Sequence, residues 1–309
     1  YFGNTEQLAS GKFGYLIEYY KRSNTGFKEL DTNNVTRASH EADTGFSKSE
    51  PMIKLFFEPK SSLYQRIEAK FGYTNLDANE TYLGISRADF SANPYRRYLG
   101  SRFDEIETTQ FRQHIRHFIE FSPKTSLVTT AYGNTFNRNW QKLNSVNGRN
   151  LSTSGLIAAG DLATLKGTAA GTLAVRNNNR TYYSYGIQST LNHELVTAGG
   201  TKHEIEVGIR QHYDQVRRVQ WDETFTQNAN GGIDSVTVGA RGSESNRTQQ
   251  THATTVHASD AMSKGKWTFK PGARVEYISG TYWNGDRTDA GVVTGDRDYA
   301  VVVGGGSLK

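Results

Sequence analysis

Arginine and tyrosine are concentrated in one polar stretch of the chain, between residues 74 and 108. A guanidinium group binds a carboxylate through two parallel hydrogen bonds, so several guanidinium groups together suit a polyanionic ligand. A further arginine, Arg138, lies two residues before Trp140. We predict that the following side chains contact a ligand: Tyr95, Arg96, Arg97, Arg102 and Arg138.

The sequence gives little support for metal binding or catalysis. His114 and His117 are three residues apart, so on a strand they point to opposite faces and cannot share a metal ion. The 309 residues contain no cysteine, no His-Glu-x-x-His pair, no Gly-x-Ser-x-Gly and no phosphate-binding loop motif. We therefore expect no metal site, no cofactor and no enzyme activity.

β-Strands must position the predicted ligand contacts. Apolar and charged side chains alternate strictly along the chain, and a helical period is nearly absent. In residues 63–73 every charge falls on one face, and residues 203–214 and 266–277 repeat this pattern. Weaker or blurred versions predict further strands at 1–9, 13–22, 46–57, 111–120, 126–136, 181–192, 248–260 and 298–308. The sequence therefore predicts ten or eleven strands, with an irregularity at Pro271, which cannot donate a ladder hydrogen bond.

The connections between these strands alternate in length. Short turns rich in Gly, Pro and Ser alternate with long polar segments at about 23–45, 74–108, 137–179, 217–247 and 279–297. The alternating runs are long enough for a tilted strand to cross the hydrocarbon core, which takes roughly 9–11 residues. Short turns at one end and long loops at the other are typical of a transmembrane β-barrel.

The composition is compatible with such a barrel and excludes several other classes. Hydrophobic residues make up 35% and aromatic residues 12% of the chain, and the mean hydropathy is −0.66. The longest unbroken apolar run is Tyr299–Val303, far short of a transmembrane helix. A barrel shows lipid only every second residue, so its average hydropathy resembles that of a water-soluble protein. The net charge of +5 is spread along the chain and does not point to nucleic acid.

The alternation assigns side chains to the two faces of an antiparallel up-and-down barrel. We predict that the following ionic residues face the lumen: Arg66, Glu68, Arg112, Arg116, Glu204, Glu206, Arg210, Arg274 and Glu276. We predict that the following residues face lipid: Ile67, Phe71, Ile115, Ile205, Val207, Ile209, Trp267 and Phe269. The reason is that a lysine or arginine facing lipid at the bilayer midplane costs roughly 2–4 kcal/mol.

Two segments carry a family resemblance. They are residues 82–98, Tyr-Leu-Gly-Ile-Ser-Arg-Ala-Asp-Phe-Ser-Ala-Asn-Pro-Tyr-Arg-Arg-Tyr, and residues 131–143, Ala-Tyr-Gly-Asn-Thr-Phe-Asn-Arg-Asn-Trp-Gln-Lys-Leu. Both resemble TonB-dependent outer-membrane receptors, most closely the ferric-citrate receptor-like branch. Residues 207–210, 217–221 and 267–276 agree, the last with a tryptophan, then Pro-Gly, then Arg. The resemblance runs over residues 11–308.

The resemblance implies a 22-stranded barrel that holds a plug in the outer membrane of a Gram-negative bacterium. It implies energy-coupled uptake of a ferric chelate, either ferric citrate or another siderophore, and the partners would be outer-membrane lipid, the plug and the TonB complex. We expect residues 1–309 to be one partial barrel domain, an internal fragment without the plug domain, the TonB box and the C-terminal strands. Haem, cobalamin and oligosaccharide receptors share this barrel.

Other functions are also compatible with the pattern. A soluble β-rich carbohydrate-binding or adhesin module would bury the same apolar faces against a second sheet. A barrel enzyme would need a serine, a histidine and an acid at one rim. In the receptor itself, Arg96 and Arg97 could instead pack against neighbouring loops or bind lipopolysaccharide phosphates.

Overall fold

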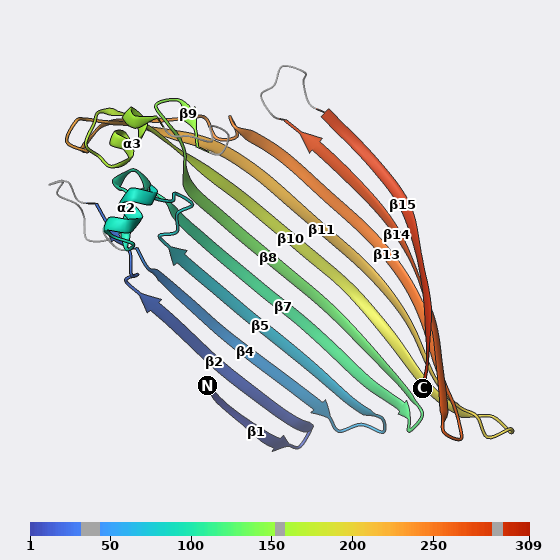
Figure 1. Cartoon of the computed structure of the whole chain (residues 1–309). Helices are drawn as coiled ribbons and strands as arrows, with labels where there is room; N and C mark the ends of the chain where they lie inside the picture. Colours follow the sequence, from blue (N-terminus) through green and yellow to red (C-terminus); the bar gives the residue numbers. More distant parts are fainter. Residues whose placement is uncertain (32–43, 152–157, 286–292) are drawn as a thin grey trace.

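The computed structural model describes residues 1–31, 44–151, 158–285 and 293–309. Its main feature is one large antiparallel sheet in which each long strand pairs with its neighbours in the sequence (Figure 1). The long strands are β1 (Phe2–Leu8), β2 (Gly11–Asn24), β4 (Phe46–Pro59), β5 (Tyr64–Ala78), β7 (Glu105–Ser122), β8 (Thr125–Val146), β10 (Gly171–Val196), β11 (Lys202–Gln227), β13 (Ser245–Lys264), β14 (Trp267–Asn284) and β15 (Val293–Leu308). This up-and-down order confirms the predicted fold class.

The remaining elements belong to the long connections. They are β3 (Glu29–Leu30), α2 (Arg87–Ala92), β6 (Arg96–Arg97), η1 (Leu99–Ser101), β9 (Arg149–Asn150), α3 (Ala159–Leu165) and β12 (Ile233–Val238). Strand β3 pairs with β6 in a separate small sheet. Neither of the described α-helices, with six and seven residues, is long and apolar enough to cross a membrane.

The strand register separates charged from apolar side chains. Glu68 pairs with Arg116 on what we term the charged face, and the neighbouring Ile67 points to the other, apolar face. On β11 the apolar side chains of Val207 and Ile209 are 43% and 55% exposed. No second sheet covers the apolar face in the described parts of the chain, which argues against a β-sandwich.

Short turns and long loops lie at opposite ends of the sheet, as predicted (Figure 1). Gly265 has a φ of 61° in the two-residue turn between Lys264 and Trp267, a backbone conformation that favours glycine. The predicted strand boundaries were wrong at the loop ends, because β10 and β11 have 26 residues each. Parts of the predicted loops 23–45, 137–179 and 279–297 lie outside the described residues.

Pro271 interrupts the ladder between β13 and β14, which confirms the predicted irregularity. The pairs Ser259–Gly272 and Met262–Phe269 are present, and none lies between them. A proline has no N–H to donate, so the hydrogen bonds on that side of β14 cannot form.

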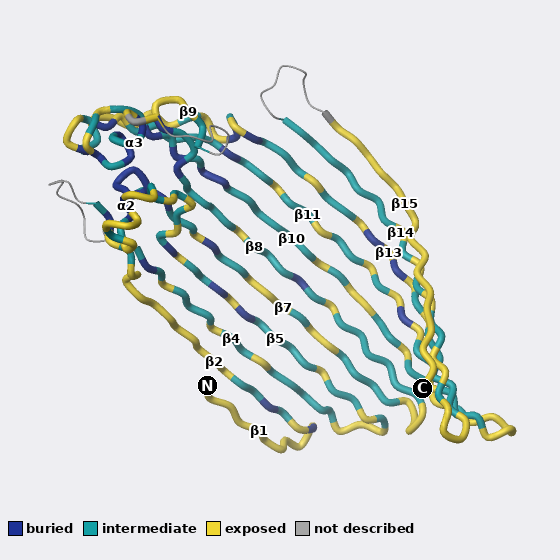
Figure 2. The backbone as a smooth tube through the Cα atoms, in the orientation of Figure 1, coloured by how far each residue is buried: buried dark blue, intermediate teal, exposed yellow. Residues whose placement is uncertain are grey.

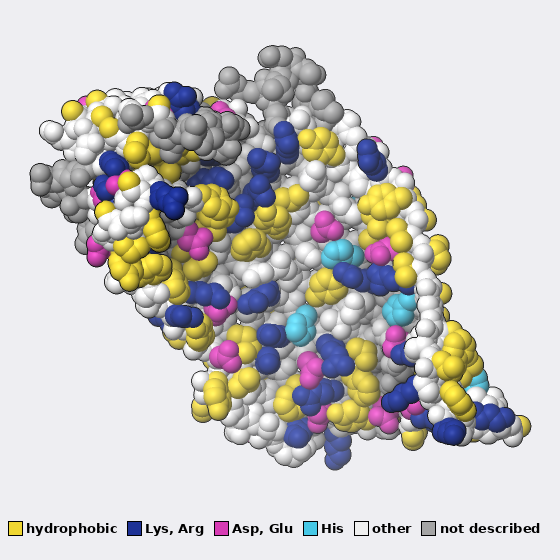
Figure 3. Space-filling model, viewed as in Figure 1, with side chains coloured by type: hydrophobic (Ala, Val, Ile, Leu, Met, Phe, Trp, Pro, Cys, Tyr) yellow, Lys and Arg dark blue, Asp and Glu magenta, His cyan; other side chains and the backbone are white. Residues whose placement is uncertain are grey.

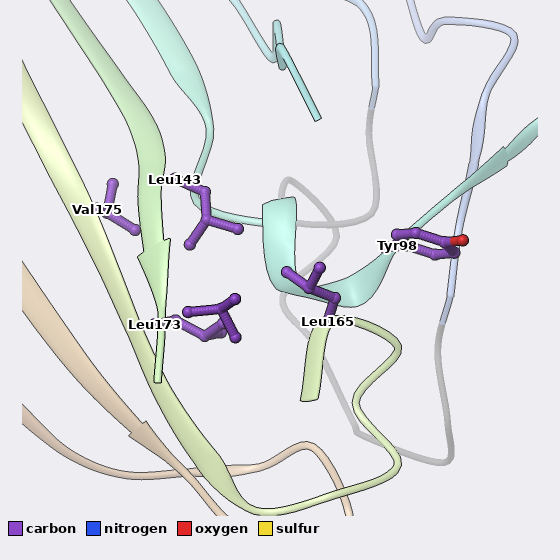
Figure 4. Close-up of a cluster of buried hydrophobic side chains, with 6 residues drawn as sticks. Tyr98, Leu143, Leu165, Leu173 and Val175 are labelled. Atoms are coloured by element: carbon purple, nitrogen blue, oxygen red, sulfur yellow. The ribbon is translucent and has the colours of Figure 1, made fainter. Parts of the chain in front are cut away.

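The loops at one end of the sheet build a small hydrophobic core of their own (Figure 4). Figure 2 shows buried residues concentrated there, whereas most of the sheet is only partly covered. The cluster joins the loop before β7, the α3 segment and the ends of β8 and β10; its members are Tyr98, Leu143, Val146, Leu165, Leu173 and Val175. We refer to these packed loops as the loop assembly.

Candidate ligand-binding site

Arg96, one of the predicted ligand contacts, lies inside the loop assembly. Its Nε lies 2.9 Å from Asp31 Oδ1, and its Nη1 lies 2.7 Å from Asp89 Oδ1. Hydrogen bonds from Lys166, Ser86 and Tyr98 hold the pKa of Asp89 well below its usual range. Asp89 is therefore ionised, and its ion pair with Lys166 connects α2 to the end of α3.

Arg97 and Arg102 are buried in the same loop. Arg97 donates to Ser101 Oγ at 2.9 Å, and Arg102 donates to the carbonyl oxygen of Gly231 at 2.8 Å. Tyr95 is exposed and touches Phe27 edge-on. Three of the predicted arginines thus have internal contacts, and ligand contact by Tyr95, Arg96, Arg97 or Arg102 stays a prediction.

Arg138 belongs to a row of four arginines on the charged face. It pairs with Arg180 on β10, Arg180 pairs with Arg218 on β11, and Arg218 pairs with Arg247 on β13. We term these four residues the arginine row. Figure 3 shows basic side chains gathered on this face near the loop end of the sheet.

The arginine row concentrates positive charge without acids among its nearest neighbours on these strands. The adjacent rows of the same face hold Phe136, Tyr182, Val216 and Gln249 on one side and Trp140, Asn178, Gln220 and Ser245 on the other. Like charges directly opposite each other on neighbouring strands destabilise a sheet. Such an arrangement therefore suits a site that an anion completes.

Two arginines of the row each have a buried donor atom without a hydrogen-bond partner among the described residues. The Nε atoms of Arg138 and Arg180 are buried and have no hydrogen-bond partner there. Arg180 donates through Nη1 to Tyr182 Oη at 3.4 Å, which is a long contact. Buried donors of this kind are costly unless a partner satisfies them.

Arg176 differs from the arginines of the row. It lies on the same face of β10, four residues closer to the loop end than Arg180. Arg176 donates to both carboxylate oxygens of Asp222 at 2.7 Å and also reaches Glu244 at 2.5 Å. This bidentate pairing neutralises Arg176. Arg176 thus has acidic partners, whereas no acid lies directly beside Arg138 or Arg180 on the neighbouring strands.

The arginine row is connected to the loop assembly through an aromatic contact. Trp140 lies beside Arg138, whose guanidinium carbon is 5.8 Å from the indole ring, and the Tyr82 ring centre is 4.4 Å from that of Trp140. The ammonium group of Lys142 lies 4.5 Å above Tyr82. The loop before β7 therefore forms one wall beside the row.

A larger cavity of about 1110 Å³ is less suited to an anion. Most strand residues in its lining belong to the apolar face, and the lining includes the carboxylates of Asp77, Glu105 and Glu223 together with Arg102. Ligand atoms of Asp77, Glu105 and Glu107 lie within 4.8 Å of one another, a spacing that a cation could bridge. Exposed carboxylates often cluster in this way without a metal ion.

The predicted ionic residues share the charged face, and each has a charged or polar partner there. Arg66 Nη1 lies 2.6 Å from Glu58 Oε1, Arg116 Nη1 lies 3.2 Å from Glu68 Oε2, and Arg274 Nη2 lies 3.1 Å from Glu276 Oε2. Contacts of the others are Arg112 with Glu50, Glu204 with Lys202, Glu206 with His257 and Arg210 with Tyr132.

The residues predicted to face lipid occupy the other face. Exposed fractions there include 41% for Ile67, 51% for Ile115 and 58% for Trp267. The register places Phe71, Ile205, Val207, Ile209 and Phe269 on this face as well. That the two faces meet lumen and lipid stays a prediction.

Solved structures with a similar fold are iron-chelate receptors. The ferric citrate transporter FecA matches with a TM-score of 0.69 and 15% identity, over 99% of this chain and 38% of that one. The siderophore receptor PiuA from Acinetobacter baumannii matches with a TM-score of 0.66 and 10% identity, over 99% and 44%. The ferric-catecholate import receptor Fiu from E. coli K12 matches with a TM-score of 0.60 and 10% identity, over 98% and 48%.

The fold is that of part of a TonB-dependent receptor barrel. The chain spans less than half the length of these receptors. No sequence-family description matches the chain, and no curated protein matches it. At this identity the likeness establishes the receptor-barrel fold alone.

Three members of the arginine row were missed by the sequence reasoning. The expected strands covered residues 181–192, 203–214 and 248–260, and Arg180, Arg218 and Arg247 lie just outside them. Continuing the period of two by a few residues on each strand would have placed all three on the charged face.

Proposed function

We propose that this chain is part of an outer-membrane receptor that binds an anionic ferric chelate, such as ferric citrate or another carboxylate siderophore, and admits it to the periplasm. The proposal needs binding and gated passage, and no bond is cleaved. The barrel partners would be outer-membrane lipid, a plug domain and the TonB complex.

The membrane part of the proposal is supported by the sheet itself. Its apolar face stays uncovered along strands of 14 to 26 residues, from β2 to β11, and its charged face holds paired ions. A strand needs roughly 9–11 residues to cross the hydrocarbon core, so the longest strands extend well beyond it on the loop side.

The observation that carries the ligand class is the arginine row. Four guanidinium groups at one level of four adjacent strands would bind carboxylate or other oxyanion groups of a chelate bidentately. Its position near the loop end would make it reachable from outside the cell. The receptors with the same fold are described as ferric citrate, catecholate and siderophore receptors, which agrees with a negatively charged iron complex.

The test uses the full-length receptor, purified from outer membranes, and radioactive iron bound to citrate. The double variant Arg138→Gln with Arg180→Gln should raise the Kd at least about tenfold, because each charge-assisted hydrogen bond contributes about 1.5–3 kcal/mol. The matched control is Arg116→Gln with Arg274→Gln, which removes the same charge from arginines paired with glutamates. The control should change the Kd less than about threefold.

Two results would count against the proposal. An unchanged Kd in the folded double variant would remove the arginine row from the binding site. Failure of the wild-type receptor to bind ferric citrate, another carboxylate chelate or a catecholate chelate, together with binding of haem, cobalamin or an oligosaccharide, would refute the substrate class.

A further inference from the structure

A second basic site lies on the apolar side of the sheet, and neither the arginine row nor the residues of the hydrophobic cluster line it. A cavity of about 390 Å³ opens there over β10, β11 and the start of β13. Its lining residues are Asn179, Thr181, Arg217, Val219, Arg241 and Asn246. We term it the Arg217–Arg241 pocket.

The strand register fixes the face on which this pocket opens. Arg217 pairs with Thr181 on β10 and with Thr248 on β13. Along β11 it is four residues from Tyr213 and eight from Ile209, with an unbroken ladder between them, so the three side chains share a face. The pocket therefore continues the apolar face toward the loop end.

An aromatic row lies four residues below Arg217 on the same face. Tyr185 stacks on Tyr213 with ring centres 6.0 Å apart, and Tyr213 lies 4.7 Å from His252 on the next strand. Below this row the face carries Ile187, Ile209 and Val256. Aromatic rings with an apolar band on one side are typical of a membrane–water interface.

The depth of the pocket follows from strand geometry. From the turn at Thr201 to Tyr213, β11 rises roughly 40 Å along the strand, or about 28 Å along the membrane normal at a tilt of about 45°. This matches an apolar band about 25 Å tall. Arg217 lies about 9 Å further out by the same arithmetic, at the level of the outer lipid headgroups.

The chemistry of the pocket suits a phosphate ester. Arg217 and Arg241 are both exposed, and no carboxylate is among the described residues that line the pocket. The guanidinium of Arg241 lies 5.1 Å above the ring of Trp221, a contact that orients the planar group. Arginine forks bind phosphate oxygens bidentately, and the side chains of Asn179 and Thr181 add neutral donors.

We propose that the Arg217–Arg241 pocket binds the phosphorylated headgroup of a glycolipid in the outer leaflet, with the acyl chains lying on the apolar band below. A lipid is favoured over a free anion because the pocket joins a surface that only acyl chains would cover. The inference rests on the membrane orientation of the proposed function, and it is independent of which chelate the receptor binds.

The experiment measures lipid retention by the full-length receptor in mild detergent, using native mass spectrometry with added diphosphoryl lipid A. The wild type should retain one lipid per barrel, and Arg217→Gln with Arg241→Gln should weaken retention at least about tenfold. The matched control is Arg112→Gln with Arg116→Gln, two exposed arginines of the charged face, which should retain lipid as the wild type does. Monophosphoryl lipid A should bind the wild type more weakly.

Three outcomes would overturn the inference: equal retention by the pocket variant, equal loss in the control variant, or displacement of the lipid by millimolar inorganic phosphate, which would indicate a site for a free anion. Heat-modifiable migration on gels would show that each variant is folded. The Kd for ferric citrate, measured on the same preparations, separates this test from that of the proposed function, because the pocket variant should keep the wild-type value.

Discussion

Asp104 is a buried carboxyl group whose ionisation should loosen the loop assembly. It is 2% exposed and accepts hydrogen bonds from the Leu143 backbone at 2.6 Å and from Thr81 Oγ1 at 2.5 Å. Burial raises its pKa to about 6, although both hydrogen bonds and the nearby charges of Arg97 and Lys142 favour the ionised form. We predict that Asp104→Asn removes the part of the pH dependence of loop docking that Asp104 causes.

The expected size follows from linkage between protonation and opening. A carboxyl whose pKa is higher in the closed loop than in the open loop binds its proton more tightly when closed, so closure is favoured at low pH. Stability is therefore lost as the pH rises from the open-state value of 3.8 through the closed-state value of about 6. Between pH 5 and pH 8 the loss is about 1.4 kcal/mol, or about tenfold in the opening equilibrium constant.

Hydrogen exchange with mass spectrometry measures this constant for the segments around Asp104 and Leu143 in the full-length protein. After correction for intrinsic exchange, wild-type protection should fall about tenfold between pH 5 and pH 8. In Asp104→Asn the amide can still accept from Leu143 and can donate to Thr81, so the tenfold fall that Asp104 causes should disappear. Any remaining slope would come from Glu105, because burial and the neighbouring Asp77 raise its pKa to about 7. Asp89, whose pKa is lowered, remains ionised throughout this range and cannot produce the effect.

The reasoning would be refuted by wild-type protection that stays level or rises with pH after the correction. It would also be refuted if Asp104→Asn kept the wild-type slope, because another group would then be responsible. Peptides from the centre of β11 serve as the internal control, since they should show no such dependence.

Three other predictions concern the sheet and its loops. Val207→Lys should cost roughly 2–4 kcal/mol of barrel stability by placing a charge in the apolar band, whereas Glu206→Lys on the charged face should cost far less, as the folded fraction on heat-modifiability gels will show. Leu165→Ala, at a fully buried position of the loop assembly, should destabilise the loops by about 2–5 kcal/mol and speed their proteolysis. Asn147 has a φ of 48° in the turn after β8, so Asn147→Ala should lower local exchange protection more than Asn147→Gly does.

The sequence predicted the sheet because one rule governs most of it. A period of two assigns a face to each side chain, and glycine or proline at short intervals marks the turns. The strand ends failed the same rule, because apolar and polar side chains no longer alternate strictly in residues 137–146 and 215–227 at the loop end of the sheet. Asn147-Gly148, a strong hairpin signal, would have marked the true end of β8.

The arginine-rich loop illustrates what composition cannot decide. Arg96 and the row member Arg138 are both arginines in polar stretches, yet the first meets two aspartates and the second meets another arginine. Asp89 is only seven residues from Arg96, but Asp31 and Arg180 are brought to Arg96 and Arg138 by loop packing and register over about 65 and 40 residues. Only coordinates reveal which guanidinium groups are already neutralised.

The contact between Tyr82 and Trp140 raises the question of whether the loop assembly gates the arginine row or only walls it. If the closed state of the loop is several kcal/mol more stable than the open state, a tenfold change in the opening equilibrium constant leaves the closed fraction near one. The Kd of the chelate then cannot change measurably. The six-residue core and the ionised Asp89 favour this situation. We therefore predict that the ratio of the Kd values of Asp104→Asn and wild type stays within about twofold at both pH 5 and pH 8. A ratio that moved toward tenfold at pH 8 would show that the open loop is already well populated there and that the loop acts as a gate.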